Sequence, residues 1–215
     1  MKSNLFVSHQ KRRRNVFIRE VISWLTTIIL TIIIALFISG NIFSLTGIKG
    51  QSMEPTFYED ERVINYKLGY NFTAPKRNQI VIINRYEGQE RGIVKNIINE
   101  GKDIITNILN KFTNNIDEKY IIKRVIGVPG DIIDIKDGDV YLNGHKLEED
   151  YIKGNTFARE DLGYPLTIPE DKVFVLGDNR EHSLDSRDLG LIDYSQVKGK
   201  VTFRIWPLKS ISKVS

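Results

Sequence analysis

The pattern of hydrophobic residues divides the chain into one long apolar run and a series of short ones. Residues 21–39 read VISWLTTIILTIIIALFIS and carry no charge. At about 1.5 Å per residue, a helix of this length spans roughly 28 Å, close to the thickness of the bilayer hydrocarbon. The pattern predicts a transmembrane helix over residues 21–39. A cleaved signal peptide is disfavoured, because the residues 37–41, FISGN, make a poor small-x-small cleavage site.

The charges that flank this run predict its orientation. Four consecutive basic residues at positions 11–14, and then Arg19, precede the run, whereas the next basic residue after it is Lys49. By the positive-inside rule, residues 1–20 are a cytoplasmic basic N-terminus and residues 40–215 an extracytoplasmic domain. A basic run can also bind nucleic acid, but beside a membrane span it is more typical of a topology signal or a contact with lipid headgroups.

Short β-branched runs separated by turn residues fill most of the chain beyond residue 40. The pattern predicts strands at 42–48, 62–66, 79–83, 121–128, 132–135, 140–142, 172–176 and 200–205. Asp137-Gly138 and Asn143-Gly144 favour the positive φ angles of tight hairpin turns. Many short strands with turns between them indicate a mainly β fold, either a barrel or a sandwich, and not a parallel α/β sheet.

Residues 91–115 break this pattern, because their apolar residues recur at intervals of three and four. Such spacing predicts an amphipathic helix, interrupted at Gly101. Two interpretations of this helix stay open. It either packs on the body of the domain, which we favour, or lies on the outer surface of the membrane.

Composition excludes several classes of function. The 215 residues are 41% hydrophobic, enough for one or two domains with a core. The net charge of +4 comes largely from the N-terminus, which argues against a nucleic-acid-binding domain. The chain has no cysteine, so disulfides, thiolate catalysis and zinc–thiolate sites are excluded. Its three histidines are scattered, so we expect no metal site and no cofactor.

Ser52 is the first candidate for chemistry. It lies in the sequence GQSMEPT at residues 50–56, about a dozen residues beyond the apolar run. Gly50 and Pro55 constrain the backbone, which could expose the Ser52 hydroxyl and turn its amide toward a developing oxyanion. The alternative is that Ser52 only makes a turn, as serines near Gly and Pro usually do.

Lys123 is the second candidate, and it lies inside another apolar run, residues 120–131. A serine hydroxyl needs a base to take its proton, and lysine is a base only when it is neutral. Burial among apolar groups disfavours the ammonium form and lowers a lysine pKa from its reference value of about 10.4. In a strand, Lys123 shares a face with Ile121 and Val125. The alternative is an exposed lysine that protects an edge strand from aggregation.

A polar loop is the third candidate segment, with the sequence GDNREHSLDSRD at residues 177–188. Asp185 and Arg187 could pair, and Ser183 could orient a lysine amine. The alternative is a surface turn held by Asx motifs. His182 offers a Ser/His/Asp triad, which we favour less.

Taken in this order, the three segments resemble the type I signal peptidases, also called leader peptidases, in their Gram-positive form. The matching motifs are Ser-Met-x-Pro-Thr from Ser52, Lys-Arg-Val-x-Gly-x-Pro-Gly-Asp from Lys123, and Gly-Asp-Asn-Arg-x-x-Ser-x-Asp-Ser-Arg from Gly177. Residues 80–83 look like a further strand motif of that family, with Asn78-Gln79 where Gly-Asp is usual. Residues from about 88 to 117 lie outside the resemblance.

The resemblance implies a membrane-anchored serine endopeptidase that removes signal peptides from secretory preproteins by cutting after small residues. The implied roles are Ser52 as nucleophile and oxyanion donor, Lys123 as general base, Ser183 as the group that orients Lys123, and Asp185 with Arg187 as a supporting ion pair. The small apolar substrate pockets would be lined by Ile48, Met53, Ile121 and Ile122. Gly50 stands where some members have a serine, so the second oxyanion donor would be a backbone amide or water.

The implied fold is a β-barrel-like catalytic domain with a small β appendage at about 134–168 and a helical insert at about 91–115. We expect a monomeric, single-pass protein of the bacterial cell membrane that contacts lipid and does not bind nucleic acid. Two rivals are a self-cleaving repressor-type Ser/Lys protease and an inactive, tethered β-domain that binds peptides. The membrane span and the lack of a helix-turn-helix count against the first. Intact Ser52, Lys123 and Ser183 count against the second.

Overall fold

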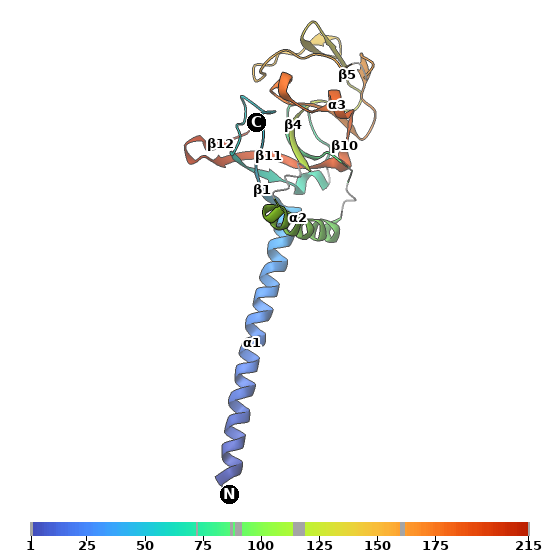
Figure 1. Ribbon diagram of the computed structural model, residues 1–215. Coiled ribbons are helices and arrows are strands. Elements are labelled where there is room, and N and C mark those ends of the chain that lie inside the picture. The colour runs from blue at the N-terminus through green and yellow to red at the C-terminus, as the bar shows by residue number, and fades with distance from the viewer. Residues whose placement is uncertain are drawn as a thin grey trace.

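A long helix carries a mainly β domain at its C-terminal end, with a second helix between the two (Figure 1). The computed structural model describes residues 2–71, 73–86, 88, 92–113, 119–159 and 162–214. The long helix is α1 (Lys2–Asn41), and the second is α2 (Ile93–Thr113). Helix α2 lies between the C-terminal end of α1 and the β domain.

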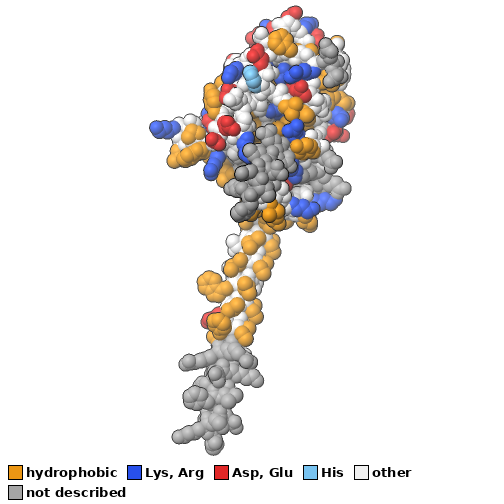
Figure 2. Space-filling view, in the orientation of Figure 1, with side chains coloured by type: hydrophobic (Ala, Val, Ile, Leu, Met, Phe, Trp, Pro, Cys, Tyr) orange, Lys and Arg blue, Asp and Glu red, His pale blue; other side chains and the backbone are white. Residues whose placement is uncertain are grey.

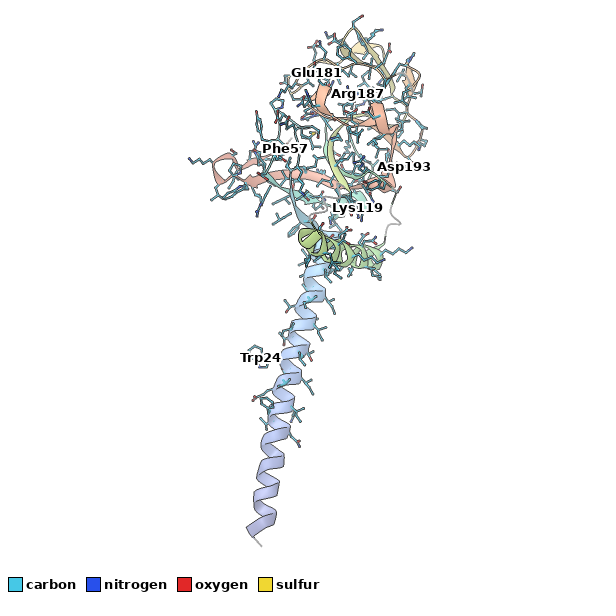
Figure 3. All side chains as sticks on the ribbon, in the orientation of Figure 1. Trp24, Phe57, Lys119, Glu181, Arg187 and Asp193 are labelled. Atoms are coloured by element: carbon cyan, nitrogen blue, oxygen red, sulfur yellow. The ribbon has the colours of Figure 1, made fainter. Side chains whose placement is uncertain are left out.

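Helix α1 contains a stretch, Asn15–Asn41, that is long and apolar enough to cross a membrane. Its most apolar window has a mean hydropathy of 2.7 and no part of it is buried. The stretch includes the predicted span of residues 21–39 and extends it at both ends. Hydrophobic side chains cover this stem in Figure 2, and Trp24 points away from the helix in Figure 3. A helix of this length and apolar surface fits a membrane anchor.

The large sheet is antiparallel and has the strand order β1-β2-β11-β3-β4-β9-β10, with β12 paired to β11. The bounds of its strands are β1 (Phe43–Gly47), β2 (Arg62–Tyr66), β3 (Ile80–Asn84), β4 (Tyr120–Gly127), β9 (Lys172–Leu176), β10 (Ile192–Asp193), β11 (Val197–Trp206) and β12 (Ser212–Lys213).

A smaller antiparallel sheet has the order β7-β6-β5-β8, formed by β5 (Ile132–Lys136), β6 (Asp139–Leu142), β7 (His145–Lys146) and β8 (Leu166–Thr167). Asp137, Gly138, Asn143 and Gly144 all have positive φ, as the predicted hairpin turns require. The remaining short elements are η1 (Leu68–Asn71), η2 (Arg180–His182), α3 (Ser186–Leu189), η3 (Tyr194–Gln196) and η4 (Leu208–Ser210).

The core lies on both faces of β3, and this explains why that strand reads as a continuous apolar run. Ile80 and Ile82 pack with Met53 in one cluster, whereas Val81 and Ile83 belong to a second cluster on the other face. A third cluster joins the small sheet to the end of β4 and to β9. Strands buried on both faces do not alternate between apolar and polar residues. The core therefore fixes β3, and with it the neighbouring strand β4.

The prediction of a mainly β chain with one N-terminal apolar helix is confirmed. The predicted strands occur with shifts of one to three residues at most ends. The predicted interruption of the second helix is wrong, because α2 runs through Gly101. Residues 91 and 114–115 of that predicted segment lie outside the described residues. The proposed domain boundaries stay predictions.

Candidate active site

Ser52 and Lys123 meet at the centre of the candidate site. Lys123 Nζ donates a hydrogen bond of 2.7 Å to Ser52 Oγ, although the two residues are 71 positions apart in the sequence. The Lys123 side chain is buried, with only 2% of the residue exposed. Strand β4 pairs with β3 through Val81 opposite Lys123 and with β9 on its other side. Lys123 thus lies on an interior strand, and the edge-strand interpretation is wrong.

The turn that carries Ser52 is held by its neighbours. Gly50 has a φ of +72°, a left-handed conformation that favours glycine. Phe57 N donates to Met53 O at 2.8 Å, and both of these side chains are buried. Ser52 N donates no hydrogen bond to any described residue. Its N–H is therefore available to an oxyanion formed at the hydroxyl.

Asn179 fixes the same turn from the polar loop, and the sequence did not assign it a role. Its backbone N–H donates to Ser52 O at 3.1 Å, and its side-chain Nδ2 donates to Gln51 O at 3.1 Å. Asn179 is buried. The first bond holds the nucleophile by its own backbone carbonyl, and the second holds the residue before it. The only signal in the sequence was the place of Asn179 within a dense polar motif.

Ser183 is buried behind Ser52, but its Oγ makes no hydrogen bond with any described residue. The hydrogen bond to Lys123 that the resemblance implied is therefore not formed in this structure. Gly177 lies against both serines. A Cβ added to Gly177 would lie 2.5 Å from Ser52 O and closer still to Ser183 Oγ. Glycine at position 177 allows Ser183 to approach the nucleophile's backbone.

Gly177→Ala is expected to destabilise the domain by about 1–3 kcal/mol, because the added methyl group overpacks a buried site. We also expect the rate of substrate cleavage to fall, because Ser52 O cannot move without shifting the nucleophile. Gly163→Ala is the matched control, since a Cβ at Gly163 meets nothing within 4 Å. Chemical denaturation and cleavage rates of both variants check this. Equal effects of the two substitutions would contradict it.

Asp185 and Arg187 form a buried ion pair, with Arg187 Nε 2.8 Å from Asp185 Oδ1. Asp185 Oδ2 also accepts a 3.0 Å hydrogen bond from Gly177 N, so the pair holds the strand end next to Ser52. Burial alone would lower the pKa of Arg187. The hydrogen bond to Asp185 and its negative charge outweigh this effect and raise the pKa above its ordinary value. The pair lies behind the groove and supports the loop.

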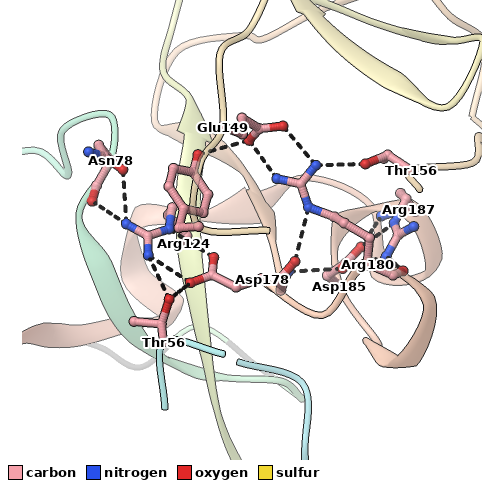
Figure 4. A network of polar contacts seen from close by, with 11 residues as sticks. Thr56, Asn78, Arg124, Glu149, Thr156, Asp178, Arg180, Asp185 and Arg187 are labelled. Atoms are coloured by element: carbon pink, nitrogen blue, oxygen red, sulfur yellow. Dashed lines mark hydrogen bonds and ion pairs between the residues drawn. The ribbon is translucent and has the colours of Figure 1, made fainter. Parts of the chain in front are cut away.

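A second buried network adjoins the site (Figure 4), and its partners were not predicted. Arg124 Nε and Nη2 donate to the two carboxylate oxygens of Asp178 at 2.8 and 2.7 Å. Thr56 Oγ1 donates to the same carboxylate, and Arg124 Nη1 donates to Asn78 Oδ1 at 2.9 Å. Asn78 has a φ of +66°. Asn tolerates this conformation better than most residues, which explains how it can stand where glycine is usual.

The network continues to Arg180, which lies on the same loop as Asp178. Arg180 donates to the Glu149 carboxylate and, at 2.6 Å, to Thr156 Oγ1. Tyr151 donates to Glu149 at 2.8 Å and lies under the Arg124 guanidinium, 3.8 Å from ring centroid to Cζ. The polar loop thus links β4 to the segment between β7 and β8 through largely buried side chains, and the surface-turn interpretation is wrong.

A groove of about 390 Å³ opens over Ser52 and Lys123. The structure places all four predicted pocket residues on its wall: Ile48, Met53, Ile121 and Ile122. His182 lines the groove too, but Ser52 Oγ is bonded to Lys123 and not to His182. The geometry therefore favours a Ser/Lys pair over a histidine triad.

A smaller polar cavity of about 230 Å³ shares Thr46, Tyr120 and Asn107 with this groove and extends toward α2. Lys198 lines it, and burial lowers the pKa of Lys198 to about 8. The groove over Ser52 thus adjoins a cavity lined by the charged side chains of Lys67, Glu100, Asp103 and Lys198.

Comparisons with known proteins identify the class of this site. A family model described as signal peptidase, peptidase S26, matches residues 21–206. Signal peptidase I of Bacillus licheniformis is 34% identical over 202 residues, which cover 90% of this chain and 93% of the relative. Signal peptidase IB of Staphylococcus aureus (strain COL) is 34% identical over 204 residues, which cover 88% and 91%. A crystal structure of a signal peptidase I from Enterococcus faecalis V583 is 28% identical and matches 60% of this chain and 98% of that chain, with a TM-score of 0.39.

The family match and these relatives show that the protein is a serine peptidase. The chain belongs to the signal peptidase family, peptidase S26.

Proposed function

We propose that this protein is a membrane-anchored signal peptidase I that removes N-terminal signal peptides from secreted preproteins through a Ser52/Lys123 dyad. The observation that carries the proposal is the 2.7 Å contact between a buried amine and a serine hydroxyl on the wall of a groove. Burial favours the neutral amine, because the ammonium ion loses more hydration. Only the neutral amine can accept the hydroxyl proton.

In the proposed mechanism Lys123 takes the proton of Ser52 as Oγ attacks the scissile carbonyl carbon. The Ser52 N–H donates to the oxyanion of the tetrahedral intermediate. Lys123 then gives its proton to the leaving amine, which releases the mature protein and leaves an acyl ester on Ser52. Lys123 next deprotonates a water molecule that attacks the ester. As the ester bond breaks and frees the signal peptide, Lys123 returns this proton to Ser52 Oγ, which restores both the hydroxyl and the neutral amine.

The groove suits an extended substrate strand between residues 46–53 and β4. Ile48, Met53, Ile121 and Ile122 would line the pockets for the small side chains before the scissile bond and would exclude larger ones. Ser183 would orient Lys123 after a rotation of its side chain about χ1, because its buried Oγ otherwise lacks a partner among the described residues.

The remaining parts of the proposal concern architecture. Helix α1 would anchor the protein as a single span, with its basic N-terminus in the cytoplasm and the sheets outside. The large sheet would close into a barrel-like catalytic domain, with the small sheet as its appendage.

The test is cleavage of a purified preprotein by the full chain in detergent. We expect one cut, placed by mass spectrometry, after a segment with Ala at the first and third positions before the bond. A Leu at the first position should lower kcat/KM by about 10-fold or more, because overpacking a small pocket costs about 1–3 kcal/mol. Absence of any cut, or indifference to that Leu, would overturn the proposed specificity.

A further inference from the structure

Helix α2 turns its polar side toward the rest of the protein. Glu100 accepts hydrogen bonds from Ser39 Oγ at 2.5 Å and from Lys67 Nζ at 2.9 Å. One turn further on, Asp103 accepts them from Lys119 Nζ at 2.7 Å and from Tyr120 OH at 2.5 Å. Residues three and four apart lie on one side of a helix. These bonds therefore fix the rotation of α2 about its own axis.

Seven apolar side chains of α2 lie away from these contacts and are exposed. They are Ile93, Val94, Ile98, Ile104, Ile105, Ile108 and Leu109. Val94 is 68% exposed, Ile105 60% and Leu109 58%. An amphipathic helix of a water-soluble domain buries this side against the core. Here the opposite side is buried. The helix does pack against the rest of the protein, as we preferred from the sequence, but it does so through its polar side.

Helix α2 lies where the apolar stretch of α1 ends. A Cβ added to Gly40 would lie 2.9 Å from Asn96 O, so the two helix backbones touch at this glycine. Asn96 Nδ2 donates to Asn41 Oδ1 at 3.0 Å, and Asn41 is the last residue of α1. Figure 1 shows α2 lying across the end of α1, under the sheet. The exposed face of α2 therefore lies close to the end of the apolar stretch of α1.

The charges beside this face fit a lipid surface. Lys95 and Lys102 are both exposed on α2, seven residues apart, so they lie on the same side of the helix. Basic side chains next to an apolar face are typical of helices that lie in the plane of a membrane, where they meet anionic headgroups.

We propose that α2 is an interfacial helix whose apolar face lies in the outer leaflet, next to the point where α1 leaves the bilayer. The inference rests on the proposed anchoring by α1 and extends it, because the second contact fixes the catalytic domain against the lipid. Asn107 of α2 lines the groove that holds Ser52, so the same helix connects the lipid surface with the substrate site.

Cysteine labelling of the full chain tests this, since the chain contains no natural cysteine. Ile98→Cys and Ile105→Cys would each carry a nitrobenzoxadiazole label, in vesicles of phosphatidylcholine and phosphatidylglycerol. We expect quenching by lipids with a nitroxide near the headgroup, and protection from aqueous iodide. A label at Lys146→Cys, on the small sheet, should be quenched by aqueous iodide and not by the headgroup nitroxide. A label at Ile29→Cys should be quenched by a nitroxide deep in the acyl chain.

The pattern of results separates the two proposals. Iodide quenching at 98 and 105 with deep nitroxide quenching at 29 would overturn the interfacial helix and leave the anchoring intact. Iodide quenching at 29 as well would overturn the anchoring. In the Ile98→Cys protein, a further Ile105→Glu substitution should lower nitroxide quenching several-fold, whereas the neighbouring exposed Thr106→Glu should not. Equal quenching in both would also overturn the inference.

Discussion

Replacing Lys123 by Met, or Ser52 by Ala, is expected to abolish measurable cleavage. Loss of a general base costs about 10²–10⁴-fold in rate, and loss of a serine nucleophile costs up to about 10⁶-fold. Met has nearly the length of Lys and no charge, so the buried position on β4 stays filled. Single-turnover cleavage of a preprotein, quantified by mass spectrometry, measures both rates. Wild-type activity in either variant would remove the proposed mechanism.

The pH dependence provides an independent check of the role of Lys123. In the wild type, kcat/KM should fall as the pH drops, because protonation of the amine removes the base. Lys172→Met on the neighbouring strand β9 is the matched control, since Lys172 forms an exposed ion pair with Asp193. That variant should keep both the rate and the pH profile. If Lys123→Met instead kept measurable cleavage with the wild-type pH profile, the titrating group would be another residue.

Asp178→Ala is expected to destabilise the catalytic domain by about 3–5 kcal/mol, because it leaves the Arg124 charge buried without its carboxylate. Both side chains are almost completely buried, so water cannot replace the lost partner. Thr56 also loses its acceptor. Urea denaturation of the full chain in a mild detergent measures the free energy of unfolding.

Two further variants test the cause of this loss. Asp134→Ala breaks the ion pair with Lys136, which is largely exposed, and should cost about 1 kcal/mol or less. Arg124→Met combined with Asp178→Ala should be less destabilising than the sum of the two single changes, because the double variant no longer buries an unpaired charge. Strict additivity would show that Asp178 acts through packing and not through its charge.

The sequence predicted the local parts of this site well. Ser52, Lys123 and the polar loop each lie in compact motifs whose residue types indicate their chemistry. The strands were also predictable, since β-branched runs and Asn-Gly or Asp-Gly turns act locally. The apolar stretch of α1 needs no tertiary information, because its length and lack of charge are sufficient.

Pairings between distant segments could not be predicted in the same way. Arg124 and Asp178 are 54 residues apart, and their pairing depends on the register of β4 against β9. Asn179 gained a role only when the fold brought it to the carbonyl of Ser52. The periodicity of α2 showed two faces but not which one meets the sheet. Four polar contacts to Ser39, Lys67, Lys119 and Tyr120 decide that.

The direct passage from α1 into β1 limits how far Ser52 can move relative to the end of the helix. A single residue, Ile42, separates the last residue of the helix from the first of the strand, and Lys67 N donates to Ile42 O at 2.8 Å. No slack linker lies between the proposed anchor and the nucleophile ten residues beyond Ile42. If α1 anchors the protein as proposed, this short connection would hold the Ser52 hydroxyl at a nearly fixed distance from the end of the span, and a preprotein would be cut at the small residue that its own hydrophobic segment brings to that distance.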